Sequence, residues 1–383
     1  MDFSLTEEQS MLEDSVARFV DNDYDFETRQ KISQSELGYS REMWQVFADL
    51  GWIAMPFSED DGGLGGGPVE LMLMMQQFGR GLIVEPFLAT VVLAGGVLRR
   101  TASSIQKERW LTPLIVGELQ AALAFAEPQG RFDLANIATT ATAHDNGFLL
   151  NGRKSFVLNG ASADLLIVPA RTSGAQGNKS GITLFAVGGD AHGLARRGYP
   201  VVDGHRAADI EFEDIHVSDD AILGDLDDGY DVLEAVIDEA TLAVCAEAVG
   251  IQRSMHDKTV DYSKSRIQFG VPIGSFQALQ HRMVDCLMAC EQSQSLLYWA
   301  TMLAEAGSDI APVAISGLKH QIGTGGRRVA QEAVQIHGGM GVTWELDIAH
   351  YFKRFAAIET LFGNADWHLD RYVALMGLTE RPK

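Results

Sequence analysis

The sequence has few cysteines and few cationic residues. Its 383 residues include 3 cysteines, and 30 lysines and arginines stand against 52 acidic residues, a formal net charge of −22. A basic nucleic-acid-binding face and a polybasic membrane anchor are therefore not expected. Cys245, Cys286 and Cys290 form no CxxC motif, so we expect neither a metal site nor a redox pair, and three unpaired thiols suit a reducing cytoplasm.

Long hydrophobic runs are also missing. The longest apolar stretch, residues 82–98, contains Glu85 and Pro86 and cannot serve as a membrane span. The start, residues 1–8, is acidic where a signal peptide would be basic and then apolar. With 46% hydrophobic residues, the chain is expected to form two or three globular domains in the cytoplasm.

Helical periodicity is present at both ends of the chain. The spacing of apolar residues predicts helices over 6–20, 40–50, 68–78 and 87–99, and later over 232–255, 257–266, 276–305, 311–337 and from about Ala365. Several of the later helices exceed 20 residues, which predicts an antiparallel four-helix bundle. The glycine-rich segment 58–67 matches no phosphate-loop pattern and is interpreted as a helix connection.

The middle third alternates between apolar and polar residues. Turn dipeptides at 146–147, 151–152, 159–160 and 188–189 predict hairpins, and 210–212 with 215–217 predicts a strand pair. The expected fold is therefore α+β and multidomain. It consists of an N-terminal helical domain (1–120), a middle β-barrel-like domain (121–225) and a C-terminal four-helix bundle (226–383).

Four motifs along the chain resemble those of the acyl-CoA dehydrogenase family, and they occur in the family's order. They are Ala124-Phe125-Ala126-Glu127-Pro128, Lys154-Ser155-Phe156-Val157-Leu158-Asn159-Gly160, Arg266-Ile267-Gln268-Phe269-Gly270 followed by Phe276-Gln277, and Gln335-Ile336-His337-Gly338-Gly339-Met340-Gly341. The resemblance extends to bacterial members built as two unlike subunits, of the dicarboxyl-CoA or steroid side-chain type. It implies the acyl-CoA dehydrogenase fold.

The resemblance also implies a function. Family members are flavoenzymes that oxidise an acyl-CoA thioester to its 2,3-enoyl form and pass electrons to an electron-transfer flavoprotein. The residues that match the family's FAD-binding positions are Phe125, Ala126, Phe156, Leu158, Arg266, Phe269, Gln277, Gln335, Gly338, Gly339 and Asn364. In the family, the counterparts of Arg266 and Gln335 reach the FAD of a neighbouring subunit, which implies a homo-oligomer or a heterotetramer with a second, similar subunit.

These residue types suit the cofactor. The forked guanidinium of Arg266 suits a pyrophosphate, and Gly338 and Gly339 let the backbone approach a phosphate closely. His337 is interpreted as packing beside the flavin rather than as a base. Ala126 and Leu158 replace the threonines usual in the family, and each replacement removes about 0.5–1.5 kcal/mol of hydrogen bonding. The expected result is that FAD binds with either a shifted redox potential or a more loosely held ring.

The catalytic base is missing from both of the family's usual positions. One aligns with Phe362 in the turn 361–364 and the other with Ala240. Glu247, two helical turns after Ala240, is the candidate base; the alternative is a buried Glu satisfied by a basic partner, and Glu359 and Glu239 are weaker candidates. Phe362 retains its backbone N–H, which in the family binds the thioester carbonyl.

Three hypotheses about function remain open. The chain is an active dehydrogenase, a non-catalytic or half-site partner subunit of a heteromeric dehydrogenase, or a flavin oxidase or monooxygenase on the same scaffold. The acyl group is not specified by the sequence.

Overall fold

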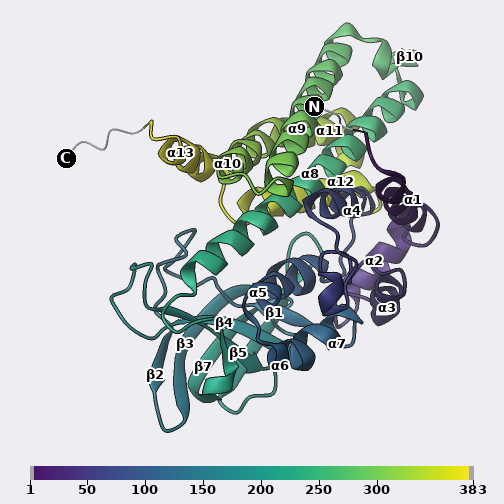
Figure 1. The fold of residues 1–383 in the computed structure, drawn as a ribbon. Helices are drawn as coiled ribbons and strands as arrows, with labels where there is room; N and C mark the ends of the chain where they lie inside the picture. The colour runs from purple at the N-terminus through teal and green to yellow at the C-terminus, as the bar shows by residue number, and fades with distance from the viewer. Residues whose placement is uncertain (1–3, 379–383) are drawn as a thin grey trace. The chain divides into compact units, whose positions relative to one another are not determined.

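The computed structural model describes residues 4–378 of the chain, which form two compact units (Figure 1). One, the helical unit, consists of the chain up to Lys31, Gly67–Ile83 and everything from Thr241 on. The other, the sheet unit, consists of Ile32–Gly66 and Val84–Ala240. No helix among the described residues is long and apolar enough to cross a membrane.

The first third of the chain is helical, as predicted. Its elements are α1 (Glu7–Asn22), α2 (Phe26–Gln34), α3 (Arg41–Asp49), η1 (Glu59–Asp61), α4 (Pro68–Gly81), η2 (Leu88–Ala94), α5 (Gly95–Thr101), α6 (Ser104–Gln106), η3 (Lys107–Leu111) and α7 (Thr112–Ile115). Thr6 and Gln9 cap α1 reciprocally, and the Ser40 side chain caps α3. The predicted helix 87–99 is continuous but contains a π-helical stretch, η2.

The middle third forms one eight-stranded sheet, so the prediction that this part of the chain folds as β-structure is confirmed. Its strands are β1 (Ala121–Leu123), β2 (Thr140–Ala143), β3 (Gly147–Leu158), β4 (Leu165–Arg171), β5 (Ile182–Gly188), β6 (Leu194–Pro200), β7 (Arg206–Ser218) and β8 (Ile222–Leu223), with η4 (Asp219–Ala221) before β8. The order is β6-β7-β3-β2-β4-β5-β8, and β1 pairs with β4 outside this path. The pairs β1–β4 and β2–β4 are parallel, and the remaining pairs are antiparallel.

Of the four predicted hairpins, the one at 146–147 is confirmed, because it joins β2 and β3, which pair antiparallel. Those at 159–160 and 188–189 were wrong, because the strands that they join, β3 with β4 and β5 with β6, are not neighbours in the sheet.

Two further predictions about the sheet were wrong. Asn151-Gly152 lies inside β3 at a register shift, where a Cβ on Gly152 would come within 2.6 Å of the Thr139 side chain. The glycine is therefore needed for close backbone approach rather than for a turn. Residues 210–217 form one strand and not a strand pair. Asp214 adopts a left-handed conformation (φ 48°), but this does not end the strand, and β7 continues to Ser218.

The last third is again helical, as predicted. Its elements are α8 (Tyr230–Ser265), the hairpin β9 (Ile267–Gln268) and β10 (Val271–Pro272), η5 (Ile273–Ser275), α9 (Gln277–Glu305), α10 (Ala311–Gln321), η6 (Ile322–Gly326), α11 (Arg327–His337), η7 (Gly338–Val342), α12 (Asp347–Thr360) and α13 (Ala365–Leu375). The predicted break at 256 was wrong: α8 runs for 36 residues, and no glycine or proline lies between residue 251 and its end at Ser265. The predicted helix 311–337 contains a π-helical stretch, η6, and α12 was not predicted.

Within the helical unit, helices pack directly against each other. α9 contacts α10 and α11, α11 contacts α12, and α10 contacts α13. α4 and α8 cross with their backbones touching, because a Cβ on Gly79 would lie 2.0 Å from the Glu247 carbonyl oxygen and one on Gly250 would lie 2.0 Å from that of Gln76. All three cysteines are buried in this unit.

Candidate active site

In the sheet unit, the first two motifs lie side by side. Phe125 and Ala126 follow β1, and the Ser155 backbone N–H, in β3, donates a 2.9 Å hydrogen bond to the Ala126 carbonyl oxygen. Phe156 adopts a left-handed backbone conformation (φ 52°) and its side chain is 39% exposed. Leu158, at the end of β3, pairs with Ala207 of β7. The structure therefore brings together the four residues that were predicted in this unit.

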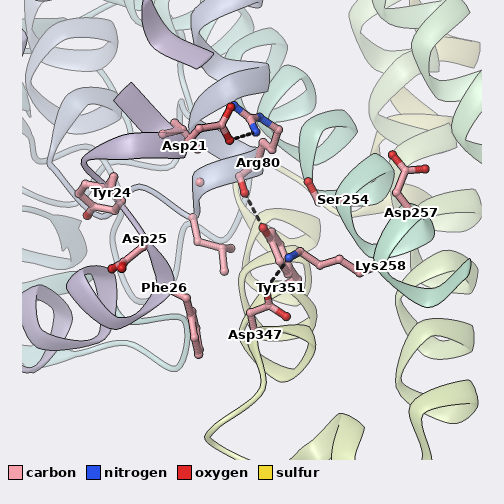
Figure 2. Close-up of a pocket in the computed structure, with 13 residues that line it drawn as sticks. Asp21, Tyr24, Asp25, Phe26, Arg80, Ser254, Asp257, Lys258, Asp347 and Tyr351 are labelled. Carbon is pink, nitrogen blue, oxygen red and sulfur yellow. Dashed lines mark hydrogen bonds and ion pairs between the residues drawn. The ribbon is translucent and has the colours of Figure 1, made fainter. Parts of the chain in front are cut away.

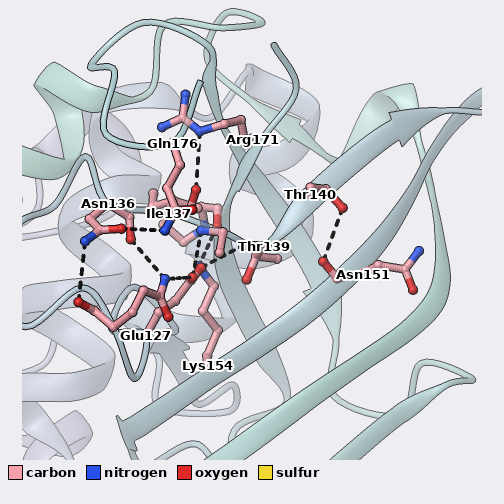
Figure 3. Close-up of polar contacts among 12 residues, drawn as sticks. Glu127, Asn136, Ile137, Thr139, Thr140, Asn151, Lys154, Arg171 and Gln176 are labelled. Carbon is pink, nitrogen blue, oxygen red and sulfur yellow. Dashed lines mark hydrogen bonds and ion pairs between the residues drawn. The ribbon is translucent and has the colours of Figure 1, made fainter. Parts of the chain in front are cut away.

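A buried ion pair lies directly beside these segments (Figure 3). Lys154 Nζ donates to Glu127 Oε1 at 2.7 Å and to the Pro169 carbonyl oxygen at 2.7 Å, and the two side chains are 0% and 2% exposed. Glu127 also accepts the backbone N–H groups of Ala138 (2.8 Å) and Thr139 (3.1 Å). The pair therefore links both motifs to the loop that precedes β2.

The pKa of Glu127 reflects these contacts. Burial by itself raises it, but the charge of Lys154 and the hydrogen bonds outweigh burial and lower the pKa to about 2. Burial lowers the pKa of Lys154 to about 8. Both residues belong to the sequence motifs, but their pairing could not be predicted, because nothing in a single sequence reports a contact across 27 residues.

The loop before β2 has a second anchor. The Arg171 guanidinium donates to five carbonyl oxygens, those of Ala135, Ile137, Ser173, Asn178 and Ser180. Figure 3 shows the contact with Ile137. Such a set of acceptors satisfies the arginine without a carboxylate and fixes the loop backbone. Sequence reasoning missed Arg171 because its partners are backbone atoms.

In the helical unit, the third motif forms the tip between α8 and α9. Arg266 and Phe269 flank β9, and Phe269 is 94% exposed with a left-handed backbone (φ 54°). Arg266 is exposed and its side chain has no hydrogen-bond or ion-pair partner among residues 4–378. Gln277 is the first residue of α9 and is also exposed. A free cation and an exposed aromatic ring thus stand together at the end of the helix pair.

The fourth motif lies beside that tip. The Tyr262 ring, near the end of α8, stacks on His337 at the end of α11, with ring centroids 4.3 Å apart. His337 is buried and bonds the Ala333 carbonyl oxygen through Nδ1 at 2.8 Å, and burial lowers its pKa. This geometry agrees with the packing interpretation of His337. Gln335 is exposed, and a Cβ on Gly338 or Gly339 would meet no atom within 4 Å.

The turn between α12 and α13 carries Phe362, which was predicted to occupy the family's usual base position. Phe362 is 8% exposed and has a left-handed backbone (φ 58°). Asn364 caps α13, because its side-chain oxygen accepts the Trp367 backbone N–H at 2.9 Å. The capping bond gives Asn364 a structural role that the cofactor-binding prediction did not include.

Glu247 is fully engaged in a buried ion pair. Arg354 of α12 donates to Glu247 through Nε (2.6 Å) and a terminal nitrogen (2.7 Å), and both side chains are 4% exposed. This is the arrangement of the alternative interpretation, a carboxylate satisfied by a basic partner in the bundle. Of the weaker candidates, Glu239 pairs with Arg99 and Arg100, and Glu359 pairs with Arg327.

The helical unit also contains a cavity that sequence reasoning did not predict. It has a volume of about 340 Å³, and Asp21, Arg80, Ser254, Lys258, Asp347 and Tyr351 are among its lining residues (Figure 2). Its cations are paired, Arg80 with Asp21 at 2.6 Å and Lys258 with Asp347 at 2.8 Å. None of the predicted site residues lines it, and its excess of carboxylates is unsuited to a phosphate-bearing ligand. Among residues 4–378, no cluster of three or more His, Cys, Asp or Glu side chains could hold a metal ion.

Comparison with known proteins gives the family. Residues 6–118, 122–215 and 227–375 match the family models described as acyl-CoA dehydrogenase N-terminal, middle and C-terminal domains. The chain is 30% identical over 325 residues to the short-chain specific acyl-CoA dehydrogenase of Megasphaera elsdenii, covering 82% of this chain and 84% of that protein. This chain therefore belongs to the acyl-CoA dehydrogenase family, and the predicted family and fold are confirmed.

Two solved structures are similar over nearly the whole chain. The first, described as PigA with FAD and proline, has a TM-score of 0.91 at 28% identity and covers 99% of this chain and 100% of PigA. The second, from the ChsE4-ChsE5 complex of Mycobacterium tuberculosis, has a TM-score of 0.90 at 27% identity and covers 100% of both chains.

Proposed function

We propose that this protein is an FAD-dependent cytoplasmic oxidoreductase that converts an acyl-CoA thioester to the 2,3-enoyl-CoA and passes the electrons to an electron-transfer flavoprotein. The observation that carries the proposal is the match to all three family domains, from residue 6 to residue 375. When bound, FAD supplies the acceptor for the hydride that leaves the β-carbon.

The described residues fit FAD. Arg266 offers an unpartnered guanidinium, and the backbone at Gly338 and Gly339 is open, so an anionic phosphate would find a cation and accessible peptide groups on the helical unit. On the sheet unit, the half-exposed Phe156 ring and the adjoining Ala126 and Leu158 offer apolar surface for a flavin ring. Phe125, Phe269, Gln277, Gln335 and Asn364 are the other residues that we assign to cofactor binding.

Arg266 provides a direct test of this assignment. Arg266→Ala removes a charge-assisted hydrogen bond to phosphate, worth about 1.5–3 kcal/mol, so FAD should be lost more readily on dialysis. The flavin content measured after dialysis, with Arg253→Ala as control, reports this loss; Arg253 is also exposed but is paired with Glu291 at 2.8 Å. Equal flavin retention in both variants would contradict the placement.

For substrate, we propose that the Phe362 backbone N–H binds the thioester carbonyl. A backbone N–H does not depend on its side chain, so the substitution of a Glu by Phe leaves this donor in place. The bound carbonyl would be polarised, and the α-proton would become more acidic.

A second candidate function is a half-site subunit that works with a second acyl-CoA dehydrogenase-like chain. Both Glu247 oxygens accept hydrogen bonds from Arg354, and Ala240 and Phe362 are apolar and buried. Proton removal needs a carboxylate that is free to accept. This observation favours a carboxylate from a partner chain over Glu247.

An oligomer is supported by the exposed apolar side chains on α9 and the hairpin beside it. They are Ile267, Phe269, Val271, Phe276, Val284, Leu287 and Met288, each at least 37% exposed. Several exposed apolar side chains on neighbouring elements are typical of a protein-protein interface. We propose that another subunit of the same fold covers it.

The test is anaerobic flavin bleaching against a panel of acyl-CoA thioesters. A self-sufficient enzyme is yellow and bleaches with at least one thioester; a half-site subunit bleaches only when mixed or co-expressed with a second dehydrogenase-like chain. Consumption of oxygen without electron-transfer flavoprotein would indicate an oxidase or monooxygenase. No bleaching in any combination would contradict the proposal.

A further inference from the structure

The turn between α12 and α13 is held by a buried lysine that has no carboxylate partner among the described residues. Lys319 of α10 is 1% exposed, and its Nζ donates to the carbonyl oxygens of Glu359 (3.1 Å) and Gly363 (2.7 Å). Burial lowers the pKa of Lys319 to about 8. Burial of a lysine is costly unless its ammonium group donates hydrogen bonds. The two hydrogen bonds to this turn therefore make the buried position of Lys319 tolerable.

The Lys319 ammonium group lies at the C-terminal end of α12, where a positive charge is favourable. Glu359 lies in the last turn of α12, where carbonyl oxygens have no partner within the helix and carry partial negative charge. An ammonium group at this point satisfies two carbonyl oxygens on either side of Phe362.

His368 of α13 holds a third carbonyl oxygen at this turn, that of Phe362. It is 1% exposed, and its Nε2 lies 3.1 Å from the Phe362 carbonyl oxygen. Burial, together with the charge of Lys319, lowers the pKa of His368 to about 3, so the ring is neutral. Because a carbonyl oxygen only accepts, Nε2 carries the proton and donates a hydrogen bond to the Phe362 carbonyl oxygen.

The turn has no room to relax into another conformation. Phe362 has a left-handed backbone (φ 58°) although it is not glycine, a strained conformation that persists only where the surroundings enforce it. Gly363 (φ 120°) is packed so closely that a Cβ would lie 2.5 Å from the Trp367 ring and 2.8 Å from His368 Nε2. Three residues around the turn, Lys319, His368 and Gly363, therefore fix the orientation of the peptide groups on either side of Phe362.

We propose that Lys319 and His368 are positioning residues that hold the Phe362 backbone in the orientation in which its N–H binds the thioester carbonyl of an acyl-CoA. The inference rests on the proposed function. It explains how the chain retains carbonyl recognition at a position where the side chain is a phenylalanine.

The first experiment tests the clamp without substrate. In Lys319→Met, which keeps the length and loses the donors, hydrogen exchange of peptides covering residues 359–364 should speed up by about tenfold or more, as expected for loss of hydrogen bonds worth about 1 kcal/mol each. Arg327→Met is the matched control. It removes the ion pair to the Glu359 side chain at the same helix end and leaves the carbonyl contacts intact. Unchanged exchange in Lys319→Met would overturn the clamp.

The second experiment tests what the clamp is for. The probes are butyryl-CoA and S-butyl-CoA, which carries a methylene where the thioester has its carbonyl, together with the same pair for any other acyl group that bleaches wild type. Lys319→Met should lose up to about tenfold of the preference for thioester over thioether, the worth of one hydrogen bond. The affinity for the thioether should be unchanged, as should both affinities in Arg327→Met.

The two experiments separate the possible failures. Altered exchange with an unchanged thioester preference would overturn the positioning role and leave the proposed function standing. A wild-type protein that binds no thioester of the panel, alone or together with a second dehydrogenase-like chain, would overturn the proposed function and the positioning role with it.

His368 provides a second route if Lys319→Met does not fold. His368→Leu removes the donor to Phe362 and should reproduce the loss of thioester preference, whereas His368→Gln places an amide N–H near the position of Nε2 and should restore it. Equal behaviour of the two variants would contradict the proposal.

Discussion

At the scale of single residues, the buried charges of this chain fall into two kinds. Glu127 with Lys154, and Glu247 with Arg354, are ion pairs closed off from solvent. Lys319 is instead held by carbonyl oxygens. Breaking a buried pair leaves an uncompensated charge, so the paired residues are sensitive positions for stability whatever their distance from the chemistry.

Glu127→Gln should destabilise the protein by about 3–5 kcal/mol near neutral pH, because it leaves Lys154 buried and unpaired. The pKa of Glu127 is lowered to about 2, so its contribution is present above the ordinary value of 4.5 and is lost as the pH falls towards 2. The difference in the free energy of unfolding between wild type and Glu127→Gln, measured with urea, should therefore become smaller below pH 4.5. Glu211→Gln, an exposed control 3.8 Å from Arg153, should cost at most about 1 kcal/mol. A gap that stays constant down to pH 3 would contradict the ionised pair.

Glu247→Gln distinguishes a structural carboxylate from a base. Loss of the pair with Arg354 should lower the free energy of unfolding by about 3–5 kcal/mol, and Glu247→Leu combined with Arg354→Met should recover much of it. Flavin bleaching by the folded complex, measured per bound flavin, should keep its rate in Glu247→Gln. If Glu247 removes the α-proton, the rate instead falls by about 10²–10⁴ while the flavin content persists.

At the scale of elements, α4 and α8 cross in close contact within the helical unit. Glycines at 79 and 250 let the two backbones touch, and any side chain there would overlap a carbonyl oxygen. The crossing places Glu247 in α8 beside α4, so the ion pair to Arg354 and the glycine contact lie at the same level of the helix.

Gly250→Ala should destabilise the protein by about 1–3 kcal/mol through overpacking at this crossing. Gly317→Ala is the matched control, since Gly317 is also inside a helix but its Cβ would meet the Tyr372 ring at an ordinary 3.5 Å. The control should be neutral or stabilising by about 0.5–1 kcal/mol, because glycine is a poor helix former. Thermal unfolding of both variants measures the difference; equal melting temperatures would contradict the close crossing.

Elements with strong periodicity were predictable and their interruptions were not. The helices α1, α3 and α9 match their predicted ranges to within a few residues, because apolar spacing and capping residues agree. The π-helical stretch η6 and the left-handed Asp214 depend on packing, which leaves no local signature. Among the site residues, motifs predicted Arg266 and Gly338, whereas the partners Arg354 and Lys319 come from helices far along the chain and could not be predicted from the sequence.

At the scale of the whole molecule, charge and apolar surface act in opposite directions. The net charge of −22 makes copies of this chain repel each other, whereas the exposed apolar side chains of α9 favour association. An interface must therefore bury enough apolar area to overcome the repulsion, which salt would screen.

The proposed oligomer should be visible by light scattering as a dimer or tetramer that retains FAD. Leu287→Glu with Met288→Glu adds charge to the α9 face and should shift the protein towards monomers with less flavin, more so at low salt. Tyr298→Phe, on the same helix, keeps the surface apolar and serves as control. A stable wild-type monomer with a full complement of FAD would contradict the interface.

The burial of the three cysteines makes each thiol an internal reporter. Burial raises the pKa of Cys245 and Cys290 to about 12 and that of Cys286 to about 11, so the reactive thiolate is scarce while the helices remain packed. Alkylation by iodoacetamide therefore requires the helical unit to open, and its rate measures how often it does. Mass spectrometry of the labelled cysteines would time the opening around Cys245 separately from that around Cys286 and Cys290, with no engineered label in the chain.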